Sequence, residues 1–337
     1  MMNAHRTGRL RAPFLLAPRL IGLTVAALAA NPAQAEAPVF GMPLECTLGA
    51  DCYIQQFVDR DPGPGQMDVG CNGLANDAHK GTDFGLSTLA EMRAGVPVIA
   101  SAPGTVRGVR DGMPDIDATD PAAPDVTGRE CGNGVAISHG DGWETQYCHM
   151  REGSVAVHQG QKVGRGTVLG LVGMSGQATF PHVHFSVRHG NTVIDPFNPD
   201  MDQACGLAGD GMWMSAPPYR PGGLLATGVI DRVPEYEEVK SGLPMDGLPD
   251  EPPAAMVIWG YAFAGEEGDV LEISIAGPGG LRGSHSDTLP KRQPFFFRAW
   301  GRKAPAGGFP AGAYRGEVVH RRGDEVLDRR EVAFDLP

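Results

Sequence analysis

Short runs of apolar and β-branched residues, separated by glycine-rich turns, recur along most of the chain. Between residues 66 and 205, no apolar period of 3.6 is sustained over a dozen positions; the nearest to one is a short helical turn near 86–92. This pattern predicts an antiparallel, all-β domain over 66–205. Its clearest strand runs are 96–100, 134–138, 143–149, 167–172 and 183–187.

The flanking segments predict a second β-domain. Residues 36–65 form a proline-punctuated entry segment with a strand run at 52–58, and 206–250 are a glycine- and proline-rich linker with one short strand near 224–233. In 251–337 the strand spacing, without any helical pattern, predicts a small, Ig-like β-sandwich. Its strands are expected at 256–263, 270–275, 295–300, 314–321 and 326–334.

The first 35 residues follow a different pattern. Four arginines precede an apolar run at 20–30, and the small-x-small sequence Ala33-Gln34-Ala35 follows it. The run is shorter than the ~20 residues that cross a bilayer, although an uncleaved anchor or a core helix is the alternative. We therefore expect residues 1–35 to be a cleaved signal peptide. The mature protein is then exported, periplasmic or extracellular, and has no transmembrane segment.

Export changes the interpretation of the six cysteines. In an oxidising compartment an even number without any CxxC pair indicates disulfides rather than a metal–thiolate site. Six cysteines allow 15 pairings. Loop closure and the hairpin at 134–149 favour Cys46–Cys52, Cys131–Cys148 and, for the remaining two, Cys71–Cys205.

The charge excludes one class of function. With 40 acidic and 28 basic side chains the net charge is −12, which argues against a general nucleic-acid binder. Five aspartates lie in an irregular loop at 109–131, but the EF-hand spacing and closing glutamate are missing, so we expect a solvated loop rather than a calcium site. Nothing in the sequence specifies an oligomeric state.

Two histidines stand on one predicted strand. Side chains alternate along a strand, so His182 and His184 point the same way and can share a site. Alone this signal is weak, because two histidines on a solvated strand face would look the same.

A second pair lies earlier in the chain. His79 and Asp83 are four residues apart, but Gly81 and Thr82 between them make a helix improbable. A turn that runs into a strand can instead bring the imidazole and the carboxylate to one metal ion. Both are suitable zinc ligands, and three such ligands plus water make an open, catalytic site.

The hairpin at 134–149 supplies the last histidine. Strand alternation predicts that Trp143, Thr145, Tyr147 and His149 share one face, while Cys148 faces the other way. The side chain of His149 can then point into a groove. Hydrolysis by a metal-bound water also needs a proton acceptor and a donor to the tetrahedral oxyanion, and histidine titrates in the range for both.

The three fragments His79-x-x-x-Asp83, Tyr147-Cys148-His149 and His182-x-His184, in this order, resemble the lysostaphin/LytM-type zinc endopeptidases that cut peptidoglycan cross-bridges. The resemblance covers about 73–199. It implies a small antiparallel β-domain with a groove for an extended peptide, and one zinc ion per chain bound by His79, Asp83 and His184. It also implies that His149 and His182 are the catalytic pair, with either as the base. The chain departs from the family in the 109–131 insertion, in its cysteines and in Val183, where leucine is usual.

We therefore expect an exported zinc metalloendopeptidase that hydrolyses peptidoglycan stem peptides or cross-links. The alternatives are a non-catalytic LytM-type activator of cell-wall amidases and a peptidase of secreted proteins. The complete five-residue set and the lack of coiled-coil heptads favour the enzyme. No site role is expected for the other histidines, at 5, 139, 158, 189, 285 and 320.

Overall fold

The computed structural model describes residues 8–9, 36–200, 205–249 and 252–337. The expected signal peptide, 1–35, lies outside the described residues except for positions 8 and 9, so it stays a prediction. Residues Glu36–Pro337 form one unit. Among the described residues, no helix is both long enough and apolar enough to cross a membrane.

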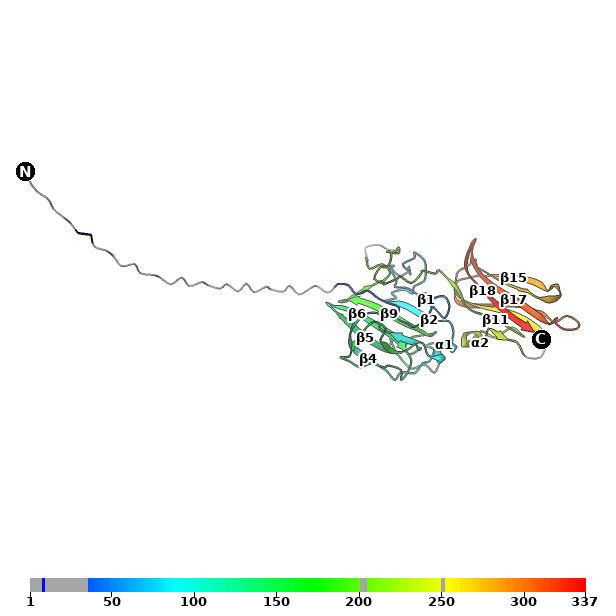
Figure 1. The fold of residues 1–337 in the computed structure, drawn as a ribbon, viewed down its shortest axis with the longest axis horizontal. Helices are drawn as coiled ribbons and strands as arrows, with labels where there is room; N and C mark the ends of the chain where they lie inside the picture. Colours follow the sequence, from blue (N-terminus) through cyan, green and yellow to red (C-terminus); the bar gives the residue numbers. More distant parts are fainter. Residues whose placement is uncertain (1–7, 10–35, 201–204, 250–251) are drawn as a thin grey trace, which may run out of the picture. The chain divides into compact units, whose positions relative to one another are not determined.

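An eight-stranded antiparallel sheet forms the centre of the segment before residue 200 (Figure 1). Its strands are β1 (Cys52–Gln56), β2 (Thr82–Leu86), β4 (Gly104–Arg110), β5 (Asn133–Gly140), β6 (Trp143–Met150), β7 (Lys162–Val163), β9 (His182–His189) and β10 (Thr192–Ile194). They lie in the order β1-β2-β9-β6-β5-β4-β7. β2 pairs with the first half of β9 and β10 with its second half.

One face of this sheet is packed into the core and the other carries polar side chains. Along β9 the odd-numbered residues Val183, Phe185 and Val187 are at most 1% exposed because they pack inward, whereas His189 at the end of the strand is exposed. The even-numbered positions are His182, His184, Ser186 and Arg188. This period of two is what a strand with one packed face requires. We call the face with the even-numbered residues of β9 the polar face.

Smaller elements complete this part. α1 (Leu89–Ala94) follows Thr88, which forms a capping box with Glu91, and confirms the helical turn predicted near 86–92. β3 (Pro97–Ile99) and β8 (Val168–Leu171) pair with each other in a separate sheet.

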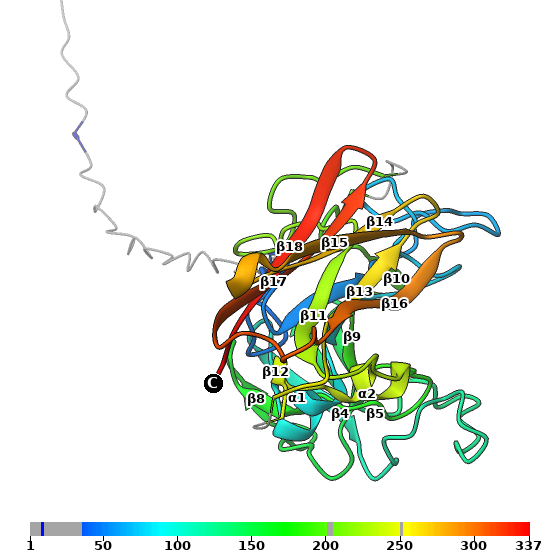
Figure 2. The ribbon, with the colours of Figure 1, turned by 90° about the vertical axis from the view of Figure 1, so that its right-hand side faces the viewer.

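Two four-stranded sheets make up the C-terminal part (Figure 2). The first has the order β12 (Asp246–Gly247), β11 (Gly223–Ile230), β13 (Ala255–Gly265), β16 (Gln293–Lys303), and the second β15 (Arg282–Thr288), β14 (Val270–Ala276), β17 (Gly312–Arg322), β18 (Glu325–Leu336). A 3-10 turn, Pro278–Gly280, and α2 (Tyr236–Ser241) are its helical elements among the described residues. Side chains such as Ile258 and Val318 share one core between the sheets.

The all-β class is therefore confirmed, with antiparallel sheets throughout except for the parallel β11–β12 pair. The strand predicted near 224–233 corresponds to β11. The description of 251–337 as a separate, Ig-like domain and the proposed domain limits stay predictions.

The strand β13 is buried on both of its faces. Met256 and Ile258 point into the C-terminal core, whereas Val257, Trp259 and Tyr261 belong to the core of the eight-stranded sheet. Every residue of β13 except the first is consequently buried, so the strand has no polar face. The apolar core is continuous from the first part of the chain into the last.

All six cysteines are paired, which confirms the predicted connectivity. The disulfides are Cys46–Cys52, Cys71–Cys205 and Cys131–Cys148.

Candidate metal centre

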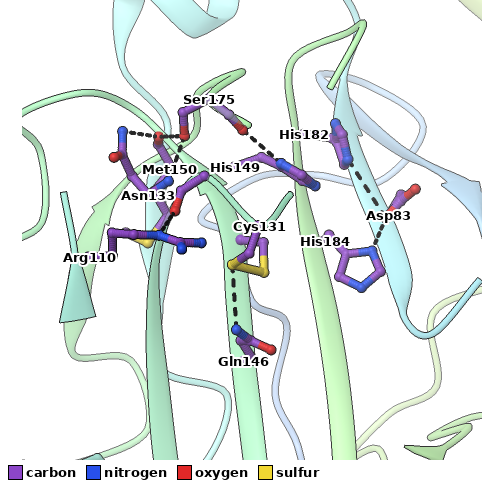
Figure 3. The surroundings of a disulfide bond; sticks show 12 residues. Asp83, Arg110, Cys131, Asn133, Gln146, His149, Met150, Ser175, His182 and His184 are labelled. Atoms are coloured by element: carbon purple, nitrogen blue, oxygen red, sulfur yellow. Dashed lines mark hydrogen bonds and ion pairs between the residues drawn. A yellow bond between two sulfur atoms is a disulfide. The ribbon is translucent and has the colours of Figure 1, made fainter. Parts of the chain in front are cut away.

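Three metal-ligand side chains meet on the polar face where β2 and β9 pair. His79 comes from the turn before β2, and Asp83 on β2 is the cross-strand partner of His184 on β9. His79 Nε2 lies 3.1 Å from His184 Nδ1 and 3.2 Å from one Asp83 oxygen. The other Asp83 oxygen is 2.8 Å from His184 Nδ1 (Figure 3). The structure thus brings together the three residues that the sequence predicted as ligands.

Gly81 allows this close approach. A Cβ atom at position 81 would lie 2.6 Å from His184 Nε2 and 2.7 Å from the Phe185 carbonyl oxygen. The second contact is with backbone, which cannot move aside easily. Any larger residue at position 81 would therefore displace the imidazole of His184.

Hydrogen bonds and neighbouring charges set the protonation of these groups. His79 Nδ1 lies 2.7 Å from the Phe57 carbonyl and donates to it, so Nε2 keeps its lone pair toward the cluster. Burial would lower the pKa of His79, but the Asp83 carboxylate outweighs it and raises that pKa. Burial would raise the pKa of Asp83, yet His79, His182 and the hydrogen bond with His184 hold it well below its usual range.

The spacing of the donor atoms fits a tetrahedral divalent ion. Ligand atoms at 2.0–2.1 Å from such an ion lie about 3.3 Å from one another. The separations of 2.8 to 3.2 Å are close to this value. Two imidazole nitrogens and a carboxylate oxygen are also the donor types that zinc accepts.

Two more histidines lie beside this cluster. The ring centroids of His149 and His182 are 4.6 Å apart, and His182 Nε2 lies 3.8 Å from an Asp83 oxygen. His149 Nδ1 is 2.8 Å from the Ser175 carbonyl, and His182 Nδ1 is 2.9 Å from the Phe180 carbonyl. Because a carbonyl only accepts, both Nδ1 atoms carry the proton and both Nε2 atoms are free to exchange one.

The pKa values of both histidines are lowered. Burial is the main cause for each, and His182 and His184 add to it for His149, whose pKa lies well below its ordinary value. Both rings are therefore neutral at pH 7, the state in which Nε2 can accept a proton.

The prediction that His149 shares a face with Thr145 and Tyr147 is wrong. Those two side chains are fully buried in the core, whereas Cys148 is the cross-strand partner of His184 on the polar face. His149 reaches the site because its φ of 61° breaks the strand alternation at the end of β6. Figure 3 shows the disulfide of Cys131, whose partner is Cys148, near His149.

The acidic loop at 109–131 borders the site. Asp115 accepts hydrogen bonds from the backbone N–H groups of Met174 and Glu152, and the Ala118 N–H donates to the Ala178 carbonyl. The segment 174–180 carries the carbonyls that bind both histidines. The hydrogen bonds of the loop to Met174 and Ala178 therefore help to hold this segment in place. Most of the loop is exposed, as expected of a solvated loop, but the Asp115 carboxylate accepts hydrogen bonds from backbone groups of other segments.

Several supporting groups could not be found in the sequence. The carbonyls of Phe57, Ser175 and Phe180 act through the backbone, which leaves no residue-type signal. The ring of Phe180 also stacks on His182 at 4.2 Å and contacts Phe295 of β16 at 5.3 Å. That contact joins residues 115 positions apart.

The β-sheet thus carries two histidines and an aspartate that could hold a metal ion, with two neutral histidines beside them. Residues 77–196 match the model of peptidase family M23. This part of the chain is therefore a domain of peptidase family M23.

Similar proteins match only over part of their length. The cell division protein DipM of Caulobacter vibrioides is 33% identical over 105 residues, which cover 31% of this chain and 14% of that protein. The peptidoglycan DD-endopeptidase ShyA of Vibrio cholerae is 36% identical over 109 residues, 32% of this chain and 20% of that protein. Among solved structures, the catalytic domain of the M23 protein EnpA from Enterococcus faecalis is 26% identical. The match covers 48% of this chain and 94% of that one with a TM-score of 0.31.

Proposed function

We propose that the chain is an exported zinc metalloendopeptidase that hydrolyses peptide bonds in peptidoglycan stem peptides or cross-links. The observation that carries this proposal is the convergence of three ligand side chains with two neutral histidines on one sheet face. The match to peptidase family M23, and a relative named as a peptidoglycan DD-endopeptidase, support the reaction and the substrate class.

The donor set supports zinc as the metal, held by His79, Asp83 and His184. A zinc ion bound there would supply a water of lowered pKa and polarise the scissile carbonyl. His79 is kept in the correct tautomer by the Phe57 carbonyl. Asp83 stays ionised over the whole neutral range because its pKa is lowered.

His149 and His182 move the protons. One Nε2 accepts the proton from the attacking water; the imidazolium formed, or the neighbouring histidine after the proton has passed to it, then donates to the oxygen of the tetrahedral intermediate or to the leaving amine. The Ser175 and Phe180 carbonyls fix which nitrogen faces the substrate. Asp83, 3.8 Å from His182 Nε2, stabilises that ring when it becomes protonated.

Three disulfides support export, because such bonds persist in oxidising compartments. The complete five-residue set favours an enzyme over an activator of amidases, which would not need His149 and His182 poised in this way.

The test is digestion of purified sacculi with the wild type, His149→Ala and, as a matched control, His158→Ala, whose exposed side chain lies outside the site. We expect the wild type and the control to release new amino termini, and His149→Ala to be slower by about 100-fold or more. A chelator should stop both active proteins. A metal-loaded wild type that releases no amino termini, but stimulates a cell-wall amidase, would replace the enzyme with the activator.

A further inference from the structure

The polar face also carries a pocket that none of the five site residues lines. Its volume is about 710 Å³, and it opens at the ends of β6 and β9, beside the β9–β10 turn. Its charged lining residues are Lys80, Arg107, Glu144 and Arg188.

The pocket and the metal-ligand cluster lie on the same face of the same sheet. His184 and Arg188 are both even-numbered positions of β9, four residues apart, which corresponds to about 13 Å along a strand. Arg188 pairs across the sheet with Glu144 on one side and Val193 on the other. Lys80 directly follows the candidate ligand His79. The pocket is therefore a continuation of the surface on which the candidate metal site lies.

The charge of the pocket is opposite to that of the chain. The whole chain has a net charge of −12, yet the pocket brings three cationic side chains against one carboxylate. Arg107 forms an ion pair with that carboxylate, Glu144. Within the described part of the chain, Lys80 and Arg188 have no ion-pair partner. Two positive charges are thus left to face the pocket.

The remaining lining suits a peptide. Trp143 and Val193 offer apolar surface, and Ser138 and Asn191 offer hydrogen-bonding groups. A mixture of apolar walls and a few polar groups is typical of a ligand site.

We propose that this pocket is an anion subsite of the substrate groove, in which Arg188 and Lys80 bind a carboxylate of the peptide. An extended peptide rises about 3.3 Å per residue, so the carboxylate lies roughly four residues from the scissile bond. The guanidinium of Arg188 binds the carboxylate in a bidentate manner, and the Lys80 ammonium adds a point charge. The proposal rests on the function proposed above and extends it to the choice of substrate.

The test measures equilibrium binding to the full chain in a His149→Ala background, so that no peptide is cut. The two probes are a soluble peptidoglycan stem pentapeptide with free carboxylates and the same peptide with its carboxylates amidated. We expect the free form to bind about tenfold more tightly, and the difference to shrink at high salt. Arg188→Gln and Lys80→Gln should each reduce this preference, and the double variant should remove it. Lys162→Gln, an exposed lysine on β7 outside the pocket, should leave it unchanged.

Each outcome has a separate meaning. Equal binding of the two peptides, no binding of either, or an unchanged preference in the double variant would overturn the subsite. If cleavage of sacculi persists in that case, the peptidase stands without the subsite. If the preference is present but the wild type cuts nothing, the subsite stands and the proposed activity fails.

Discussion

At the scale of single residues, the site depends on backbone carbonyls as much as on the histidines themselves. The Phe57, Ser175 and Phe180 carbonyls each accept a hydrogen bond from an Nδ1–H, and so direct an Nε2 lone pair toward the groove. In the function proposed above, His79 would use that lone pair to bind the metal ion, whereas His149 and His182 would keep theirs for protons. Environment, rather than residue type, therefore separates the ligand from the two other roles.

The division of roles predicts different metal contents for two variants. Asp83→Ala removes one of three ligands and leaves two imidazoles, so we expect most of the bound zinc to be lost. His149→Ala should keep one zinc per chain while losing turnover. Metal analysis of the purified proteins checks both. One equivalent of zinc in Asp83→Ala would contradict the ligand assignment.

The lowered pKa values predict the acid limb of the activity. A base whose pKa is lowered stays unprotonated to lower pH, so the activity should persist below the ordinary histidine value of about 6.5. We expect kcat/KM to be constant near neutrality and to fall only below about pH 6.5 as the pair becomes protonated. A profile whose acid limb is centred above pH 7 would show that these histidines are not the groups that must be neutral.

At the scale of elements, β16 is coupled to the site through two aromatic contacts. Phe295 packs on Phe180, whose ring stacks on His182 and whose carbonyl holds the same histidine. Tyr261 of β13 also stacks on Phe295, with ring centroids 6.1 Å apart. A strand far along the chain thus helps to fix the position of a candidate catalytic ring.

We expect Phe295→Ala to lower kcat by about tenfold, the scale on which loss of a supporting contact affects such sites, with zinc content unchanged. Phe309→Ala is the control, because Phe309 packs against Tyr314 in the C-terminal core instead. Steady-state kinetics and metal analysis of both variants check this. Equal kcat values for the two variants would refute the coupling.

The sequence predicts the strands that have an apolar run, whether it alternates with polar residues, as in β9, or is continuous, as in β13. β9 was predicted because its odd positions are apolar and its even positions polar. β15 was not, because Arg282–Thr288 has no apolar residue and lies at a sheet edge. The structure places His149 beside the ligand cluster, but not through the strand alternation that the sequence predicts. Its positive φ, which brings it there, cannot be recognised from the residue type. Contacts such as Phe180–Phe295 depend on the tertiary fold alone.

At the scale of the whole molecule, one apolar core joins the peptidase part to the C-terminal sheets. Tyr53 of β1 packs on Phe263 of β13 with ring centroids 4.6 Å apart, and Trp259 belongs to the same cluster. The segments on either side of Cys205 therefore stabilise each other.

A chain that ends at Cys205 should be less stable than the full chain by several kcal/mol. Each large side chain that becomes exposed to water, such as Tyr53, lowers the free energy of unfolding by about 1.5–3 kcal/mol. Thermal unfolding followed by circular dichroism is the measurement. An unfolding midpoint equal to that of the full chain would show that the peptidase part folds independently.

We propose that the chain cuts peptidoglycan peptides only when one zinc ion is bound by His79, Asp83 and His184. The most direct measurement is a titration of the metal-free chain with zinc while the release of amino termini from sacculi is followed. We predict that activity rises with added zinc and reaches its plateau at one equivalent. Activity in the metal-free chain, or none at any zinc content, would contradict this zinc-dependent function.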